Sequence, residues 1–76
     1  MSGINYYSRM KEIYDTMDKT GPNNDLVRKI DLVNQFSKDQ GLKHHTAKKW
    51  FDMACDIKVI RYMGHDDKGN DLIQVV

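Results

Sequence analysis

Cysteine, proline and long apolar runs are nearly absent from this sequence. The single cysteine, Cys55, cannot form an internal disulfide, which is typical of a protein kept in a reducing compartment. No apolar run approaches the roughly 20 residues that a membrane span needs. The first nine residues lack the charged start and apolar core of a secretory signal. We therefore expect an untargeted cytoplasmic protein with no membrane partner.

The usual patterns of catalysis and metal binding are missing as well. No nucleophile lies in a recognisable activating context, and no glycine-rich loop is present to hold a phosphate. His44 and His45 would point about 100° apart on a helix, so they are poor ligands for one tetrahedral metal ion. The acidic stretch 66–71 lacks the spacing of a calcium loop. We expect no enzymatic activity, no cofactor and no metal site.

The chain has the length and composition of one small globular domain. Its 76 residues are 39% hydrophobic and 30% charged, as in ordinary water-soluble proteins. A core of this size is close to the lower limit for independent folding, so oligomerisation would help the domain to fold. We expect a single domain over residues 1–76.

The first half of the domain is expected to hold a helix, a breaker and a short extended segment. Apolar residues at helical spacing predict a helix over residues 5–18. The only proline lies in the turn-rich segment 20–25, which ends this helix. Residues 26–30 fit either a short strand or an early start of the next helix with Asp25 as its cap. We favour the strand.

Two helices joined by a tight turn are predicted over residues 31–56. The first places Leu32, Val33 and Phe36 on one side and is expected to begin at Asp31 as its cap. Gly41 is expected to end it at positive φ, a conformation that costs little without a Cβ. The second helix is expected to bury five residues: Ala47, Trp50, Phe51, Ala54 and Cys55.

A β-hairpin is predicted over residues 57–76. Residues 57–63 and 71–76 are rich in β-branched and aromatic side chains. The segment 64–70 between them supplies turn residues, with Gly69 and Asn70 expected at positive φ. The predicted fold class is therefore α+β and mainly α, with a three-helix core followed by a C-terminal β-hairpin wing.

The segment around Gly41 resembles the helix-turn-helix of winged-helix DNA-binding proteins. The matching positions are Phe36 and Ser37 before the turn, Gly41 and Leu42 at it, Thr46 and Ala47, and the inward Trp50. The chain departs from the family at Lys43, where Ser or Thr is frequent, and at Trp50, which replaces an aliphatic residue. About half of the chain carries the resemblance directly. It implies a small free-standing transcription regulator that binds double-stranded DNA.

The charges are distributed in the way that phosphate binding requires. Residues 28–61 hold eight Lys and Arg against four Asp, a balance of +4, although the whole chain has a net charge of only +1. The flanking segments 1–27 and 62–76 are both negative, with three basic residues against four acidic ones and one against three. Positive charge is thus concentrated on the helix-turn-helix segment.

The helix from about His44 is expected to enter the major groove, because the amino-terminal half of such a helix contacts base edges. We assign Lys43, Thr46 and Lys48 or Lys49 to phosphates, and the histidines with one lysine to bases. No Arg or Asn is available there for bidentate base reading, so modest sequence discrimination is expected. The predicted DNA-binding residues are Lys43, His44, His45, Thr46, Lys48, Lys49, Arg28, Lys29 and Arg61.

Two further surfaces have alternative interpretations. The apolar side chains along one face of the helix predicted over residues 5–18 form a stripe. This stripe belongs either to the core alone or to the core plus a homodimer contact. The candidate dimer residues are Tyr6, Tyr7, Met10 and Tyr14. The expected hairpin tip is acidic, with Asp66, Asp67 and Asp71, and phosphate would repel it. A protein partner at this acidic wing is the alternative to DNA binding, and the domain would then be an interaction module within a larger complex.

Overall fold

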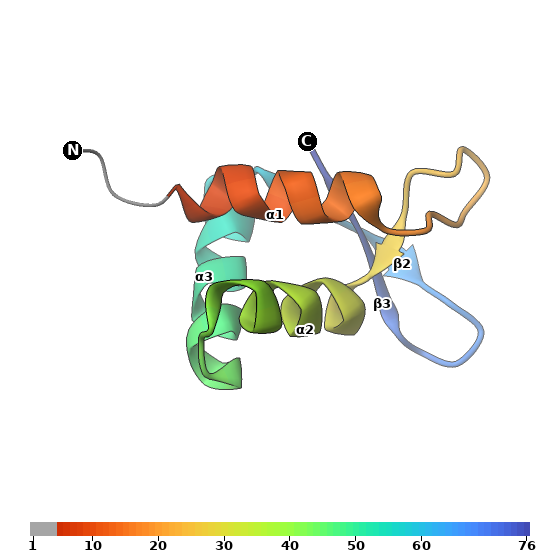
Figure 1. Ribbon diagram of the computed structural model, residues 1–76. Helices are drawn as coiled ribbons and strands as arrows, with labels where there is room; N and C mark the ends of the chain where they lie inside the picture. The colour runs from red at the N-terminus through yellow and green to blue at the C-terminus, as the bar shows by residue number, and fades with distance from the viewer. Residues whose placement is uncertain (1–4) are drawn as a thin grey trace.

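Three helices pack around one apolar core, and a three-stranded antiparallel sheet contacts all three of them (Figure 1). The computed structural model describes residues 5–76, so residues 1–4 of the expected domain lie outside the described part. The elements are α1 (Tyr6–Thr16), β1 (Val27–Arg28), α2 (Lys29–Gln40), α3 (His44–Asp56), β2 (Ile60–His65) and β3 (Asp71–Val75). This confirms the predicted mainly helical α+β class with a C-terminal hairpin.

Helix α1 begins one residue later than the sequence predicts and ends two residues early. The Oδ1 atom of Asn5 accepts hydrogen bonds from the N–H groups of Tyr7 and Ser8, at 3.1 Å each, and so caps the helix start. At the other end Met17 adopts an extended conformation. The Lys19 ammonium donates to the carbonyl oxygens of Asp15 and Met17, which satisfies backbone acceptors left free where the helix stops.

The segment 26–30 contains both of the alternatives weighed from the sequence. Val27 and Arg28 form strand β1, and helix α2 starts immediately afterwards at Lys29. The prediction that Asp31 caps α2 is therefore wrong, because Arg28 occupies the cap position and Asp31 lies in the first turn. A carboxylate there still complements the positive end of the helix dipole. Asp25 does not cap α2 either. Its carboxylate accepts a hydrogen bond from the Gln74 side chain at 2.9 Å.

The turn between α2 and α3 is closed by backbone and side-chain hydrogen bonds. Gly41 adopts the left-handed conformation, with φ 63° and ψ 32°, as predicted. The Leu42 N–H donates to the Ser37 carbonyl at 2.9 Å, and the Ser37 hydroxyl donates to the Leu42 carbonyl at 2.6 Å. These reciprocal bonds fix the angle at which α3 leaves the turn.

The core lies where the three helices and the sheet meet. The largest of the fully buried side chains are Met10, Leu32, Phe36, Phe51 and Ile73. The ring of Tyr6 packs edge-on against Phe36 and Trp50, with centroid distances of 5.5 and 4.8 Å, a favoured aromatic geometry. Trp50 is partly buried against this core rather than enclosed in it.

Two of the four residues proposed as dimer contacts belong to the core of the monomer. Met10 is 0% exposed and Tyr14 is 5% exposed, and the Tyr14 hydroxyl donates to the Asp25 carbonyl. These two side chains have no surface to offer a partner, so assigning them to a dimer contact was wrong. Tyr6 and Tyr7 are only partly buried.

The sheet has the strand order β1-β3-β2. Val27 lies opposite Ile73 on β3, and Ile73 in turn lies opposite Tyr62 on β2. Strand β2 starts at Ile60, three residues later than the predicted hairpin, because Ile57 caps α3 and Lys58 follows with φ 65°.

The register of the hairpin shifts between Tyr62 and His65, where Gly64 has φ 107°. In the turn that follows, Gly69 has positive φ as predicted, at 83°. Asn70 was also expected there, but it is not among the positive-φ residues of the described chain. The side chain of Asn70 bonds to Asp66 instead, and this contact holds the turn without a left-handed residue at that position.

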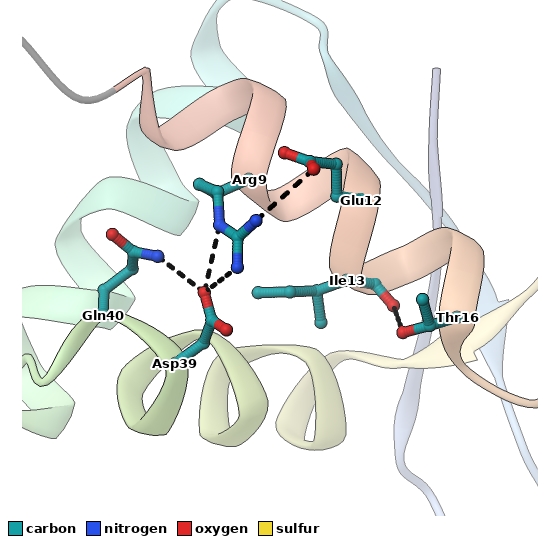
Figure 2. Close-up of polar contacts among 6 residues, drawn as sticks. All are labelled: Arg9, Glu12, Ile13, Thr16, Asp39 and Gln40. Carbon is teal, nitrogen blue, oxygen red and sulfur yellow. Dashed lines mark hydrogen bonds and ion pairs between the residues drawn. The ribbon is translucent and has the colours of Figure 1, made fainter.

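An ion pair on the surface joins α1 to α2 (Figure 2). Both Nη2 and Nε of Arg9 donate to one Asp39 oxygen, at 2.6 and 3.1 Å, and Gln40 donates to the same oxygen at 2.6 Å. These contacts lower the pKa of the Asp39 carboxyl, first through the Arg9 hydrogen bond. The pair links the two helices at their solvent-exposed edge.

Replacing Gly41 with alanine should lower the free energy of unfolding by about 1 kcal/mol, which for a domain of this size is a fall in Tm of about 5 °C. The added Cβ meets nothing within 4 Å, so the cost comes only from the left-handed backbone. Gly41→Asn is the matched control and should lose less, because Asn tolerates this conformation. Thermal unfolding followed by circular dichroism measures both, and equal losses would contradict the explanation.

Candidate nucleic-acid interface

The amino-terminal end of α3 is basic and lacks a side-chain cap. Lys43 occupies the cap position with an extended backbone, and within residues 5–76 no side chain accepts from the first N–H groups of the helix. The Ala47 N–H is the first to find a helical acceptor, the Lys43 carbonyl at 2.9 Å. Unpaired N–H groups and the helix dipole make such an end attractive to anions.

The buried face of α3 determines which of its side chains reach solvent. Ala47, Phe51 and Ala54 are turned into the core, at 0%, 1% and 0% exposure. The predicted DNA-binding residues of this helix therefore lie on the outward side, where five are exposed and Thr46 is half-buried. The exposed five are Lys43, His44, His45, Lys48 and Lys49. The structure thus brings six of the nine predicted residues together on one surface.

The charges on this surface are not neutralised by neighbouring side chains. The ion pairs found among residues 5–76 engage Arg9, Lys11 and Arg28, and none engages a lysine of the α3 surface. The exposed acids of α3, Asp52 and Asp56, lie in its carboxyl-terminal half. The helix is therefore positive at its start and negative towards its end.

A groove of about 310 Å³ runs beside the start of α3. It is bounded by the first turns of α2, by His44 and Lys48 of α3, and by the turn of the hairpin. Its lining consists of Lys29, Ile30, Val33, His44, Lys48, Gly69, Asn70 and Asp71. Three separate elements thus place ammonium, imidazole and amide groups around one concave surface, next to a single carboxylate.

Sequence reasoning missed Ile30 and Asn70 as members of this surface. Ile30 is half exposed at the start of α2, and Asn70 was interpreted only as a turn residue. Neither has a local signal, because the groove exists only once the hairpin turn lies beside α2. That placement follows from the pairing of β1 with β3, which connects segments about 45 residues apart in the sequence.

Lys29 lines the groove beside α3, whereas Arg28 lies on the face of the sheet turned away from α3, opposite Leu72. Both are already engaged. The Arg28 Nε donates to an Asp66 oxygen at 3.1 Å. The Lys29 ammonium lies 5.3 Å from the ring centroids of both Phe51 and Tyr62, a cation–π arrangement. The pKa of Lys29 is raised, chiefly by its interaction with the Tyr62 hydroxyl. Lys29 thus stays charged while it joins α2 to the hairpin.

Arg61, like Arg28, is a predicted DNA-binding residue that the fold takes away from this surface. Its neighbour Tyr62 packs edge-on against Phe51 of α3, with ring centroids 6.2 Å apart. Successive side chains of a strand point to opposite faces. Arg61 therefore lies on the face of the sheet that is turned away from α3, opposite Gln74.

The hairpin tip presents less free negative charge to solvent than the sequence suggested, because the Asp66 carboxylate is held by neighbouring groups. The Asp66 carboxylate accepts from the N–H groups of Lys68 and Asn70, at 3.0 and 2.8 Å, and from the Asn70 side chain. It also pairs with Arg28. These contacts lower the pKa of the Asp66 carboxyl, first through the Asn70 N–H. Asp66 thus organises the turn, and its charge is balanced.

Comparisons of the chain with protein-family models, with curated proteins and with solved structures find no match. Within residues 5–76, no three His, Cys, Asp or Glu side chains are grouped so that they would hold a metal ion. No helix in that range is both long and apolar enough to cross a membrane. The function therefore has to be argued from the α3 surface itself.

Asp66→Asn should flatten the dependence of stability on pH in the acid range. Folding lowers the pKa of this carboxyl below its ordinary value of 3.8. The stabilisation it supplies is therefore complete above that value and is lost as the pH falls through the lowered one. Asp67→Asn, an exposed neighbour, is the control and should keep the wild-type profile. Tm measured from pH 2 to pH 7 tests this, and identical profiles for the two variants would contradict it.

Proposed function

We propose that this protein binds double-stranded DNA through the start of α3, in the manner of small winged-helix transcription regulators. The observation that carries the proposal is the uncapped basic helix end, with five exposed donor side chains on one surface. The helix-turn-helix arrangement of α2 and α3 and the strand order of the sheet agree with it. The modest net charge of the chain does not oppose it, because the acids of α3 lie in its carboxyl-terminal half.

Phosphates would be held by two kinds of donor. The first N–H groups of α3 point along the helix axis towards an incoming anion, and the dipole favours a negative group there. The Lys43 and Lys49 ammonium groups extend from the same end and supply charge without a fixed geometry. Because each neutralised phosphate releases counterions, affinity would fall steeply as the salt concentration rises.

Base edges would be met by the side chains in the middle of the exposed face. His44 and His45 present ring nitrogens that donate or accept one hydrogen bond each, and neither forms the two-pronged contact of Arg with guanine. The preference for one DNA sequence over another would then be modest. The shape and flexibility of the duplex would supply part of it.

The groove beside α3 fits one strand of the duplex backbone. With α3 in the major groove, the adjacent sugar-phosphate strand would pass between the helix and the hairpin turn. Lys48 lines this groove and would donate to the stretch of backbone that passes through it. The single carboxylate that lines the groove, Asp71, is outnumbered there by the ammonium groups of Lys29 and Lys48.

Lys48→Ala combined with Lys49→Ala should weaken binding to a duplex of any sequence roughly tenfold or more at low salt and make its salt dependence shallower by about two phosphates. Both side chains are exposed, so the fold should persist. Lys11→Ala with Lys19→Ala removes the same charge from the opposite part of the molecule and should leave the slope unchanged. Fluorescence anisotropy of a labelled duplex over a salt series measures both. Equal effects of the two pairs would contradict the assigned surface.

An interaction module for a protein partner is the second candidate. It is favoured by strand β2, in which every residue after Ile60 is exposed, including Tyr62 and Met63. An edge strand with half-exposed apolar side chains is a usual place for a partner strand to add. Under this alternative the wild-type protein would show no duplex binding even at low salt, where a basic helix should at least associate non-specifically.

A further inference from the structure

We infer that a second copy of this chain docks on an apolar patch formed by α1, the end of α3 and the C-terminus. The patch consists of Tyr7, Trp50, Met53, Ile57, Val59 and Val76. It lies on the flank of α3 away from the groove. Of the four α1 residues expected at a dimer contact, it includes only Tyr7. Binding of a second copy goes beyond DNA binding and does not depend on it.

The patch is continuous across three segments of the chain. Tyr7, Val59 and Val76 line one shallow depression, and the Val76 N–H donates to the Val59 carbonyl at 2.8 Å. The ring of Tyr7 lies 6.2 Å from that of Trp50. From there the apolar surface continues along α3, because residues three and four apart on a helix are neighbours.

Much of this patch is open to solvent in the single chain. Met53 is 39% exposed, Ile57 is 55% exposed and Val76 is 60% exposed. The aromatic and aliphatic parts of the other three members are only partly covered. Contiguous exposed apolar surface of this kind marks an interaction site. A domain of this size also gains stability from association, because its own core is small.

The charges around the patch favour a second copy of the same chain over a partner whose surface carries charge of a single sign. Its rim carries Lys11 and Glu12 from α1, Asp56 from α3, and Lys58 after it. A twofold contact brings the same patch against itself. A rim of one sign would repel itself there, whereas this mixed rim lets lysines of one copy face carboxylates of the other.

Two other surfaces fit a partner less well. The free edge of β2 is interrupted by the register shift at Gly64 and carries the charged Arg61, and both features discourage strand pairing. The depression between α1 and α2 is bordered by Asp18, Asp31 and Asp39. Like charges would repel there in a twofold contact, and Asp39 is already held by Arg9.

Sedimentation equilibrium of the full chain without DNA, up to millimolar concentration, tests the inference. The wild type should approach twice its monomer mass of 8.9 kDa. Ile57→Lys and Val76→Lys should each remain monomeric and folded, since both side chains are largely exposed. Met63→Lys, on a half-exposed residue of β2, is the control and should associate like the wild type.

A wild type that stays monomeric at every concentration would overturn the inference. The inference would also be overturned if Met63→Lys became monomeric while both patch variants still associated. That result would place the contact at the β2 edge. Circular dichroism shows whether each variant is folded. If Ile57→Lys is unfolded, the mass of Val76→Lys tests the inference in its place. Binding of folded Ile57→Lys to a non-specific duplex at low salt is measured separately. If that monomer still binds the duplex, DNA binding is supported whatever mass the wild type shows.

Discussion

The burial of Phe51 between α2 and the sheet is the contact on which the rest of the molecule depends. With Ala47 and Ala54 it gives α3 a narrow inward face, and small alanines on either side let the helix approach its neighbours closely. Once this face is fixed, the opposite one has to be exposed, whichever residues it carries. The same ring also underlies Tyr62 and Lys29, so one side chain positions the helix, the hairpin and the start of α2.

The elements could be predicted from the sequence because their signals are local. Helical spacing located α1, α2 and α3 to within about two residues, a usual error for helix ends, and Gly41 gave the turn between the last two. The six exposed or half-exposed donors from Lys43 to Lys49 followed directly from that periodicity. The exception was the start of α2, where Asp31 in the first turn resembles a cap. Only the backbone conformation of Arg28 shows that the helix begins two residues earlier.

What the sequence did not reveal depends on contacts between distant segments. Nothing near Asp66 indicates that it bonds to Arg28, 38 residues away, so an organised turn was interpreted as a free acidic surface. The burial of Met10 and Tyr14 likewise follows from how α1 lies on α2 and β3. Amphipathic spacing distinguishes an inward stripe from an outward one, but it does not separate a stripe covered by the same chain from one covered by another.

Trp50 is the only tryptophan of the chain, and its position makes it an intrinsic optical probe. Its indole packs edge-on against Tyr6 and Tyr7 of α1 and lies across the helix from the groove lined by His44 and Lys48. Its emission would therefore respond to detachment of α1, or to another molecule resting on that flank. Occupancy of the groove would leave it almost unchanged. One spectrum would thus distinguish events on the two sides of α3 without any added label.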